Sequence, residues 1–183
     1  MASLHAGCFL FGISGTAHAE ELQEIEIELP EQFFGGTPVS TWGLNLEPED
    51  YKGRPPFKAP RGTVLLSRGK PVTSSFKTPI LGRLEQITDG DKHYAGKSLV
   101  ELGAGLQWVQ IDLEKEYEVF AILVWHFHEG QRVHFDIVVP LSNDPDFKEG
   151  VVTVFNNDHD NSSGLGVGDD KEYIANYQGR LIP

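Results

Sequence analysis

The apolar run at residues 119–127 restricts the fold of this chain more than any other feature. If the run is a strand, Ala121, Leu123 and Trp125 lie on one face and Ile122 and Val124 on the other. A strand that is apolar on both faces has to be covered on both faces. The sequence therefore predicts a central strand with core on either side of it.

The segments that flank this run show the alternating pattern of half-buried strands. Apolar residues take every second position at 107–113, and residues 132–141 alternate in the same way. In the second segment the alternation places Phe135 inward and Asp136 outward. We expect 132–141 to be one continuous, half-exposed antiparallel strand.

A short connection at 129–131 is compatible with a hairpin between this strand and the central one. His126 and His128 continue one face of the central strand, so the strand would end in a polar rim. The hairpin would bring His126, His128 and Arg132 together at one end of the sheet.

Residues 64–183 contain no convincing amphipathic helix, and their short strands are separated by glycine-rich turns. A chain of 183 residues has room for one domain with a substantial core. We therefore predict an all-β fold, an antiparallel β-sandwich, over residues 64–183.

The first 19 residues carry no acidic side chain and no Lys or Arg. They contain an apolar run and end in Ala17-His18-Ala19, the small-x-small pattern of a signal-peptide cleavage site. This pattern predicts a signal peptide at 1–19 and a secreted or periplasmic protein, although the usual basic residue near Met1 is missing. The alternative is an apolar N-terminal strand or helix. Cys8, the one cysteine, lies in this segment, so a mature chain would have no disulfide.

Residues 20–63 are predicted to form an extended arm. Eight of the eleven prolines lie between residues 30 and 79, which excludes a continuous helix or an interior strand there. The arm also carries large apolar side chains, among them Phe33, Trp42 and Phe57. A free linker has no need of such side chains, so we expect the arm to pack on the domain.

A net charge of −12, spread along the chain, argues against nucleic acid and anionic membrane surfaces as partners. Both of those partners need a basic face on the protein. The sequence also offers no segment long enough to be inserted in a membrane. The oligomeric state cannot be read from these features.

Four short motifs follow one another at residues 69–75, 87–91, 108–113 and 142–147. Their order and spacing resemble the discoidin, or coagulation factor 5/8 type C, family of galactose-binding-like jelly rolls. The resemblance covers residues 64–183 and implies a jelly-roll sandwich that binds sugars through loops at one end. It also implies that the chain ends before the last strands of the family, as a C-terminally truncated domain.

The same resemblance implies a structural calcium ion near the turn at 89–91. The ligands carried over are the Asp89 carboxylate and the backbone oxygens of Gln86 and Asp91, with Tyr94 close by. The alternative is a hydrogen-bonded turn without metal.

A sugar site requires planar hydrogen-bonding groups and an apolar platform. The polar end of the central strand and the long polar loop at 156–170 supply such groups, with Trp125 or Phe127 as possible platforms. The candidate ligand-binding residues are His126, His128, Arg132, Asn156, Asn157, Asp158, His159, Asp160 and Asn161. They predict a non-catalytic carbohydrate-binding module of an exported protein, with a glycan or polysaccharide as partner.

Two other functions remain open. A metal-dependent hydrolase could use His126 and His128, two residues apart on a strand, together with His134, His159 and Asp158. A protein-binding adhesive module could instead use the aromatic residues of the arm as an interface.

Overall fold

The computed structural model describes residues 8–14, 21–32, 43–48, 53–93, 98–130 and 132–183. Every pair of named strands is antiparallel, and the helix that lies wholly within the described residues is the short 3₁₀ helix η1 (Leu84–Ile87). The prediction of an all-β fold is confirmed. No helix within these residues has the length and apolar character needed to cross a bilayer.

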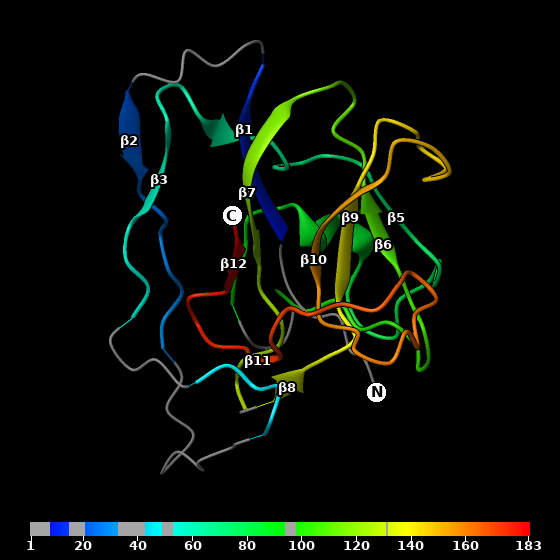
Figure 1. Ribbon diagram of the computed structural model, residues 1–183. Coiled ribbons are helices and arrows are strands. Elements are labelled where there is room, and N and C mark those ends of the chain that lie inside the picture. Colours follow the sequence, from blue (N-terminus) through cyan, green and yellow to red (C-terminus); the bar gives the residue numbers. More distant parts are fainter. Residues whose placement is uncertain (1–7, 15–20, 33–42, 49–52, 94–97, 131) are drawn as a thin grey trace.

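A four-stranded sheet forms the centre of the molecule (Figure 1). Its order is β12 (Arg180–Ile182), β7 (Glu118–Val124), β1 (Cys8–Ile13) and β4 (Val64–Leu65). The predicted central strand is therefore β7, which pairs on one side with β1 and on the other with β12.

Both faces of this sheet are covered by apolar side chains. On one face Leu123 and Trp125, both fully buried, pack with Phe9 and Phe57. On the other face Ile122 packs in a second cluster with Leu10, Leu66, Phe155, Tyr173 and Ile182. The prediction that the apolar run at 119–127 contains a central strand with core on either side of it is therefore confirmed.

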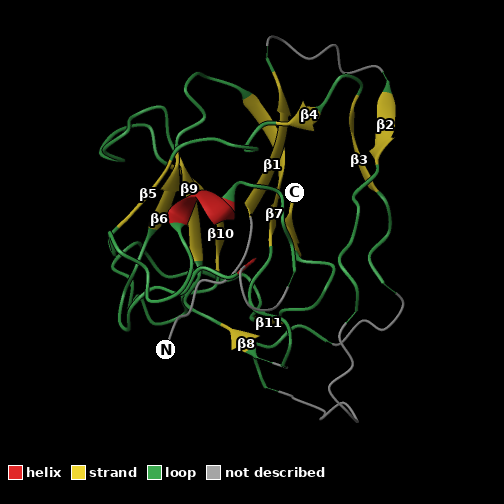
Figure 2. Cartoon of the chain, turned by 180° about the vertical axis from the view of Figure 1, so that it is seen from behind, coloured by secondary structure: helices red, strands yellow, loops and turns green. Residues whose placement is uncertain are grey.

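Four two-stranded ladders surround the central sheet (Figures 1 and 2). The pairs are β2 (Leu22–Ile25) with β3 (Phe57–Pro60), β5 (Val72–Ser74) with β6 (Val109–Ile111), β8 (Val133–His134) with β11 (Tyr173–Ile174), and β9 (Val138–Leu141) with β10 (Val152–Asn156). In both views β2 and β3 lie on the side of the molecule away from β9 and β10.

The predicted hairpin between the central strand and 132–141 is wrong. Both edges of β7 are taken by β1 and β12, which come from the two ends of the described chain. After β7 the chain leaves the sheet, and β8 pairs with β11 while β9 pairs with β10.

The expected continuous strand at 132–141 is also wrong, because it is interrupted at Asp136. Asp136 has φ of +55°, in the left-handed region that ends a strand. The interruption separates β8 from β9 and turns Phe135 outward, where its side chain is 53% exposed. Asp and Asn tolerate this conformation better than most residues, which explains why an Asp is found here.

The N-terminal segment supplies an interior strand. β1 pairs with β7 over Cys8–Ile13 and with β4 at Phe11 and Gly12, as the strand alternative for residues 1–19 would require. Close approach of the backbones requires Gly12, where an added Cβ would lie 2.2 Å from the Glu118 carbonyl oxygen. Burial raises the pKa of the Cys8 thiol to about 12, which favours the protonated thiol at neutral pH. Cleavage after Ala19 would remove this strand from the sheet.

The described parts of 20–63 contact the core. Phe57 and Ala59 of β3 are buried with Leu123 and Trp125. The Arg54 guanidinium donates hydrogen bonds from Nη1 to the carbonyl oxygens of Gln178 (2.9 Å) and Gly179 (3.2 Å). Phe33 and Trp42, on which the adhesive alternative rests, lie outside the described residues.

Candidate functional site

His126 and His128 do not form the polar rim that the sequence predicted. Their side chains are only 2% and 7% exposed. His126 Nε2 lies 2.7 Å from the Tyr173 hydroxyl, and its ring stacks on His134 with 4.1 Å between centroids. The His128 Nδ1–H donates to the His126 carbonyl oxygen at 2.9 Å. The expectation of a rim is wrong because Tyr173 and His134 cover the end of β7.

The other predicted residues of this region are divided between surface and core. Arg132 is exposed and its guanidinium lies 4.7 Å from the centre of the Phe127 ring. Trp125 is fully buried and its Nε1–H donates to the Tyr177 carbonyl oxygen at 3.0 Å. Trp125 therefore belongs to the core and cannot serve as a platform for a ligand.

Asn157 ties the loop 156–170 to the segment between β8 and β9. Its fully buried Oδ1 accepts a hydrogen bond from the Ile137 N–H at 2.7 Å. Its Nδ2 donates to the carbonyl oxygens of His134 (3.1 Å) and Lys171 (3.4 Å). The amide of Asn157 is fully occupied by the protein, so its role here is structural.

The buried Asp158 side chain stabilises the loop through hydrogen bonds to the loop backbone. Its fully buried carboxylate accepts hydrogen bonds from the backbone N–H groups of Ser162 (3.0 Å) and Ser163 (2.8 Å). Hydrogen bonds from Ser163 and Ser162 hold the pKa of Asp158 well below its usual range, although burial opposes them. The carboxylate is therefore ionised at neutral pH and fixes the first turn of the loop.

The remaining polar residues of the loop are also engaged within it. Asn156 Oδ1 accepts from the Asp158 N–H at 2.9 Å, and Asn161 Oδ1 accepts from the Gly166 N–H at 2.7 Å. The His159 Nδ1–H donates to the Gly168 carbonyl oxygen at 3.1 Å. These bonds make the loop a rigid support rather than a set of free side chains.

The exposed residues beside this support include two carboxylates, of Asp136 and Asp160, and one aromatic ring, and the buried Asp158 carboxylate lies next to the other two carboxylates. Ligand atoms of Asp136, Asp158 and Asp160 lie within 4.8 Å of one another, and the cluster could hold a metal ion. Partial burial, with Asp158 and Asp160 nearby, raises the pKa of Asp136. Phe135 precedes Asp136 and is exposed. Sequence alternation missed this pair because it placed Phe135 in the core.

The predicted calcium turn is held by hydrogen bonds. Asp89 Oδ1 accepts from the Asp91 N–H at 2.8 Å, and Asp91 Oδ2 accepts from the Ser98 hydroxyl at 2.6 Å. Gln86 Oε1 accepts from the Arg83 N–H at 2.6 Å. Gly90 has φ of +97°, as such a turn requires. These bonds are compatible with the metal-free alternative, and Tyr94 lies outside the described residues.

The histidines considered for a metal-dependent hydrolase are not grouped with other ligands. In the described part of the chain, one cluster brings together three or more side chains of His, Cys, Asp or Glu that could bind a metal ion. It consists of Asp136, Asp158 and Asp160. The set predicted for a zinc site, His126, His128, His134, His159 and Asp158, is therefore not assembled as a group of ligands within the described residues.

Comparison with known proteins identifies no relative. No family model, no curated protein and no solved structure matches this chain. The geometry of the site has to carry the functional argument.

Acid should destabilise the protein through His128. Burial lowers the pKa of His128, the His126 carbonyl opposes the shift and His93 adds to it. The unfolded chain therefore binds the proton more tightly than the folded chain does. The contribution of His128 to stability is fully present above the ordinary histidine pKa of about 6.5 and is lost as the pH falls below that value. We expect the melting temperature to fall between about pH 7 and about pH 5. His128→Asn should flatten this dependence, and equal slopes for variant and wild type would exclude His128 as the cause.

Asp136→Asn should raise the melting temperature in the presence of a chelator, by roughly 1–2 °C. The change removes a carboxylate whose pKa is raised by burial and by Asp158 and Asp160, and Asn tolerates the positive φ. Differential scanning calorimetry with and without calcium measures the effect. Added calcium should stabilise the wild type more than the variant if the cluster holds a cation. A lower melting temperature of the variant in chelator would contradict the repulsion between these carboxylates.

Proposed function

We propose that this chain is a non-catalytic carbohydrate-binding module, which binds glycan at Phe135, Asp136, Asp160 and Asn161. We call these residues the loop site. The observation that carries the proposal is the meeting of two distant segments, because Asn157 bonds the loop 156–170 to His134 and Ile137, the residues on either side of the exposed Phe135-Asp136 pair.

The chemistry of the loop site suits a sugar ring. An exposed aromatic face offers apolar contact area to the C–H face of a pyranose, at little cost in conformational entropy. Asp136, which follows Phe135 in the chain, is exposed, as are Asp160 and Asn161, and the three supply planar acceptors and an amide donor for hydroxyl groups. Hydrogen bonds to carboxylates are stronger than those between neutral groups, so few of them are needed.

The rigidity of the support favours binding. Asp158 and Asn157 are buried and hydrogen-bonded, and Asn161 is fixed to the Gly166 N–H. A surface that is already ordered loses less entropy when a ligand binds than a mobile loop does.

We include one calcium ion in the proposal. The acidic cluster of Asp136, Asp158 and Asp160 offers hard oxygen ligands, which calcium prefers. The discoidin-like jelly roll suggested by the sequence motifs remains part of the proposal, since an all-β fold with antiparallel strands is compatible with it.

A glycan array followed by calorimetric titration of the best ligand tests the loop site. Phe135→Ala should weaken binding about tenfold, the equivalent of ~1.4 kcal/mol, because it removes the apolar platform. Trp108→Ala is a matched control, since Trp108 is an aromatic residue of similar exposure, 52% against 53%, beside β6. Loss of binding in Trp108→Ala but not in Phe135→Ala, or no binding across the array, would contradict the proposal.

A further inference from the structure

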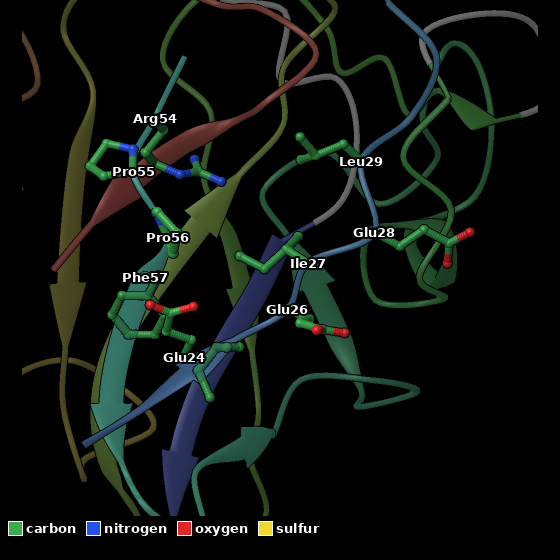
Figure 3. Close-up of a pocket in the computed structure, with 10 residues that line it drawn as sticks. Glu24, Glu26, Ile27, Glu28, Leu29, Arg54, Pro55, Pro56 and Phe57 are labelled. Atoms are coloured by element: carbon green, nitrogen blue, oxygen red, sulfur yellow. The ribbon is translucent and has the colours of Figure 1, made fainter. Parts of the chain in front are cut away.

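A groove of about 500 Å³ opens between the chain that continues β2 and the segment that precedes β3 (Figure 3). One wall consists of residues 24–29 and the other of Arg54, Pro55, Pro56 and Phe57. Its volume is within the usual range for ligand sites. The groove lies next to the β2–β3 ladder, which is on the side of the molecule away from β9 and β10.

The groove opens where the β2–β3 ladder stops. The last pair of the ladder is Ile25 with Phe57. The next residues on the β3 side are Pro56 and Pro55, which have no backbone N–H and cannot continue the pairing. The chain at 26–29 therefore runs on past the ladder as an extended edge. Such an edge is a ready template for another strand.

The side chains along this edge alternate in character. Glu24, Glu26 and Glu28 are exposed, whereas Ile25 and Ile27 pack against the core cluster of Trp125 and Phe9. In Figure 3, Ile27 points towards Pro56 and the Glu28 carboxylate points away from it. Leu29 is 39% exposed and extends the apolar strip. An occupant would therefore meet apolar contacts and carboxylates at alternate positions.

The residues that line the groove carry a net negative charge. Three glutamates and one arginine line the groove, and one positive charge set against three negative ones gives −2. The Arg54 guanidinium already donates to the Gln178 and Gly179 carbonyl oxygens, and burial lowers its pKa. Glu24 lies opposite Lys58 in the β2–β3 ladder, so Glu26 and Glu28 are the carboxylates available to a cationic occupant.

We propose that this groove binds an extended segment of a partner protein in which basic and apolar residues alternate. The segment adds to the edge at 26–29 as a further strand, through main-chain hydrogen bonds. Residues two apart on a strand are separated by about 6.6 Å, so Lys or Arg at every second position matches Glu26 and Glu28. The intervening apolar residues face Ile27, Leu29 and Pro56. This inference is independent of the glycan proposal, which concerns the loop site.

Fluorescence anisotropy with the full chain and a short labelled peptide of alternating Lys and Val tests the proposal. A peptide of alternating Glu and Val is the control probe. We expect the Lys-Val peptide to bind, the Glu-Val peptide not to bind, and binding to weaken with added salt because the contacts are partly ionic.

Variants locate the binding. The double variant Glu26→Lys with Glu28→Lys should weaken Lys-Val peptide binding by about tenfold or more, and Leu29→Ser should weaken it without changing the salt dependence. Glu116→Lys, at an exposed acidic residue outside the groove, should leave binding unchanged. Equal binding of both peptides, or wild-type affinity in the double variant, would overturn the proposal. Self-association of the chain that the double variant abolishes would also overturn it, because the occupant would then be a second copy.

Discussion

Replacing Phe9 with alanine should lower the free energy of unfolding by about 3–5 kcal/mol, the usual cost of removing a buried aromatic side chain. Phe9 is 6% exposed, and its ring meets Trp125 edge-on with 5.0 Å between centroids. Lys92 Nζ lies 4.9 Å from the centre of the same ring. The loss would leave a cavity on one face of β7. Urea denaturation monitored by tryptophan fluorescence measures the change.

Leu22→Ala is the control for this measurement. Leu22 is 63% exposed on β2, so its loss should cost less than about 0.5 kcal/mol.

The Phe9→Ala variant also tests the two interpretations of residues 1–19, a signal peptide or a strand of the fold. If the folded protein from an exporting host begins at Glu20, Phe9→Ala cannot alter it and β1 is not part of its sheet. If β1 is part of the sheet, a chain that starts at Glu20 should not fold cooperatively.

Asn157→Ala should lower the free energy of unfolding by about 3 kcal/mol. The change removes the hydrogen bonds of Asn157 to the Ile137 N–H and to the carbonyl oxygens of His134 and Lys171, and each such bond contributes about 0.5–1.5 kcal/mol. The loop site should also lose its ligand, because the loop 156–170 is no longer bonded to the segment between β8 and β9. Thermal denaturation and glycan titration on the same samples measure both effects.

Asn143→Ala is the matched control, because Asn143 is exposed in the turn that follows β9. It should change stability by less than about 0.5 kcal/mol. Equal melting temperatures for the two variants would show that the Asn157 hydrogen bonds do not anchor the loop.

The sequence predicted which strand is buried on both faces, because this depends on the pattern of apolar side chains along the strand. The apolar residues on both faces of β7 predicted that this strand is covered on both sides. In the structure Ala121 and Leu123 lie in one core cluster and Ile122 lies in the other. The pattern does not say which strands pair with β7. Its partners β1 and β12 come from the two ends of the described chain, so the short connection at 129–131 suggested a hairpin that does not form.

The candidate site was predicted less well, because exposure at the end of a strand depends on distant residues. His126 was assigned to a rim, but Tyr173 lies 47 residues further along the chain and covers it. Asp136 and Phe135 were missed because strict alternation assumes an unbroken strand, whereas Asp136 adopts a positive φ. The one available signal was the residue type, since Asp is among the few non-glycine residues that tolerate this conformation.

Mapping amide chemical shifts during titration with the best glycan ligand tests the central claim most directly. The proposal predicts that the shifts change at residues 134–137 and 158–166, around Phe135 and the acidic cluster, while β5 and β6 are unaffected. Shift changes centred on β5 and β6 near Trp108, or no changes at saturating ligand, would contradict it.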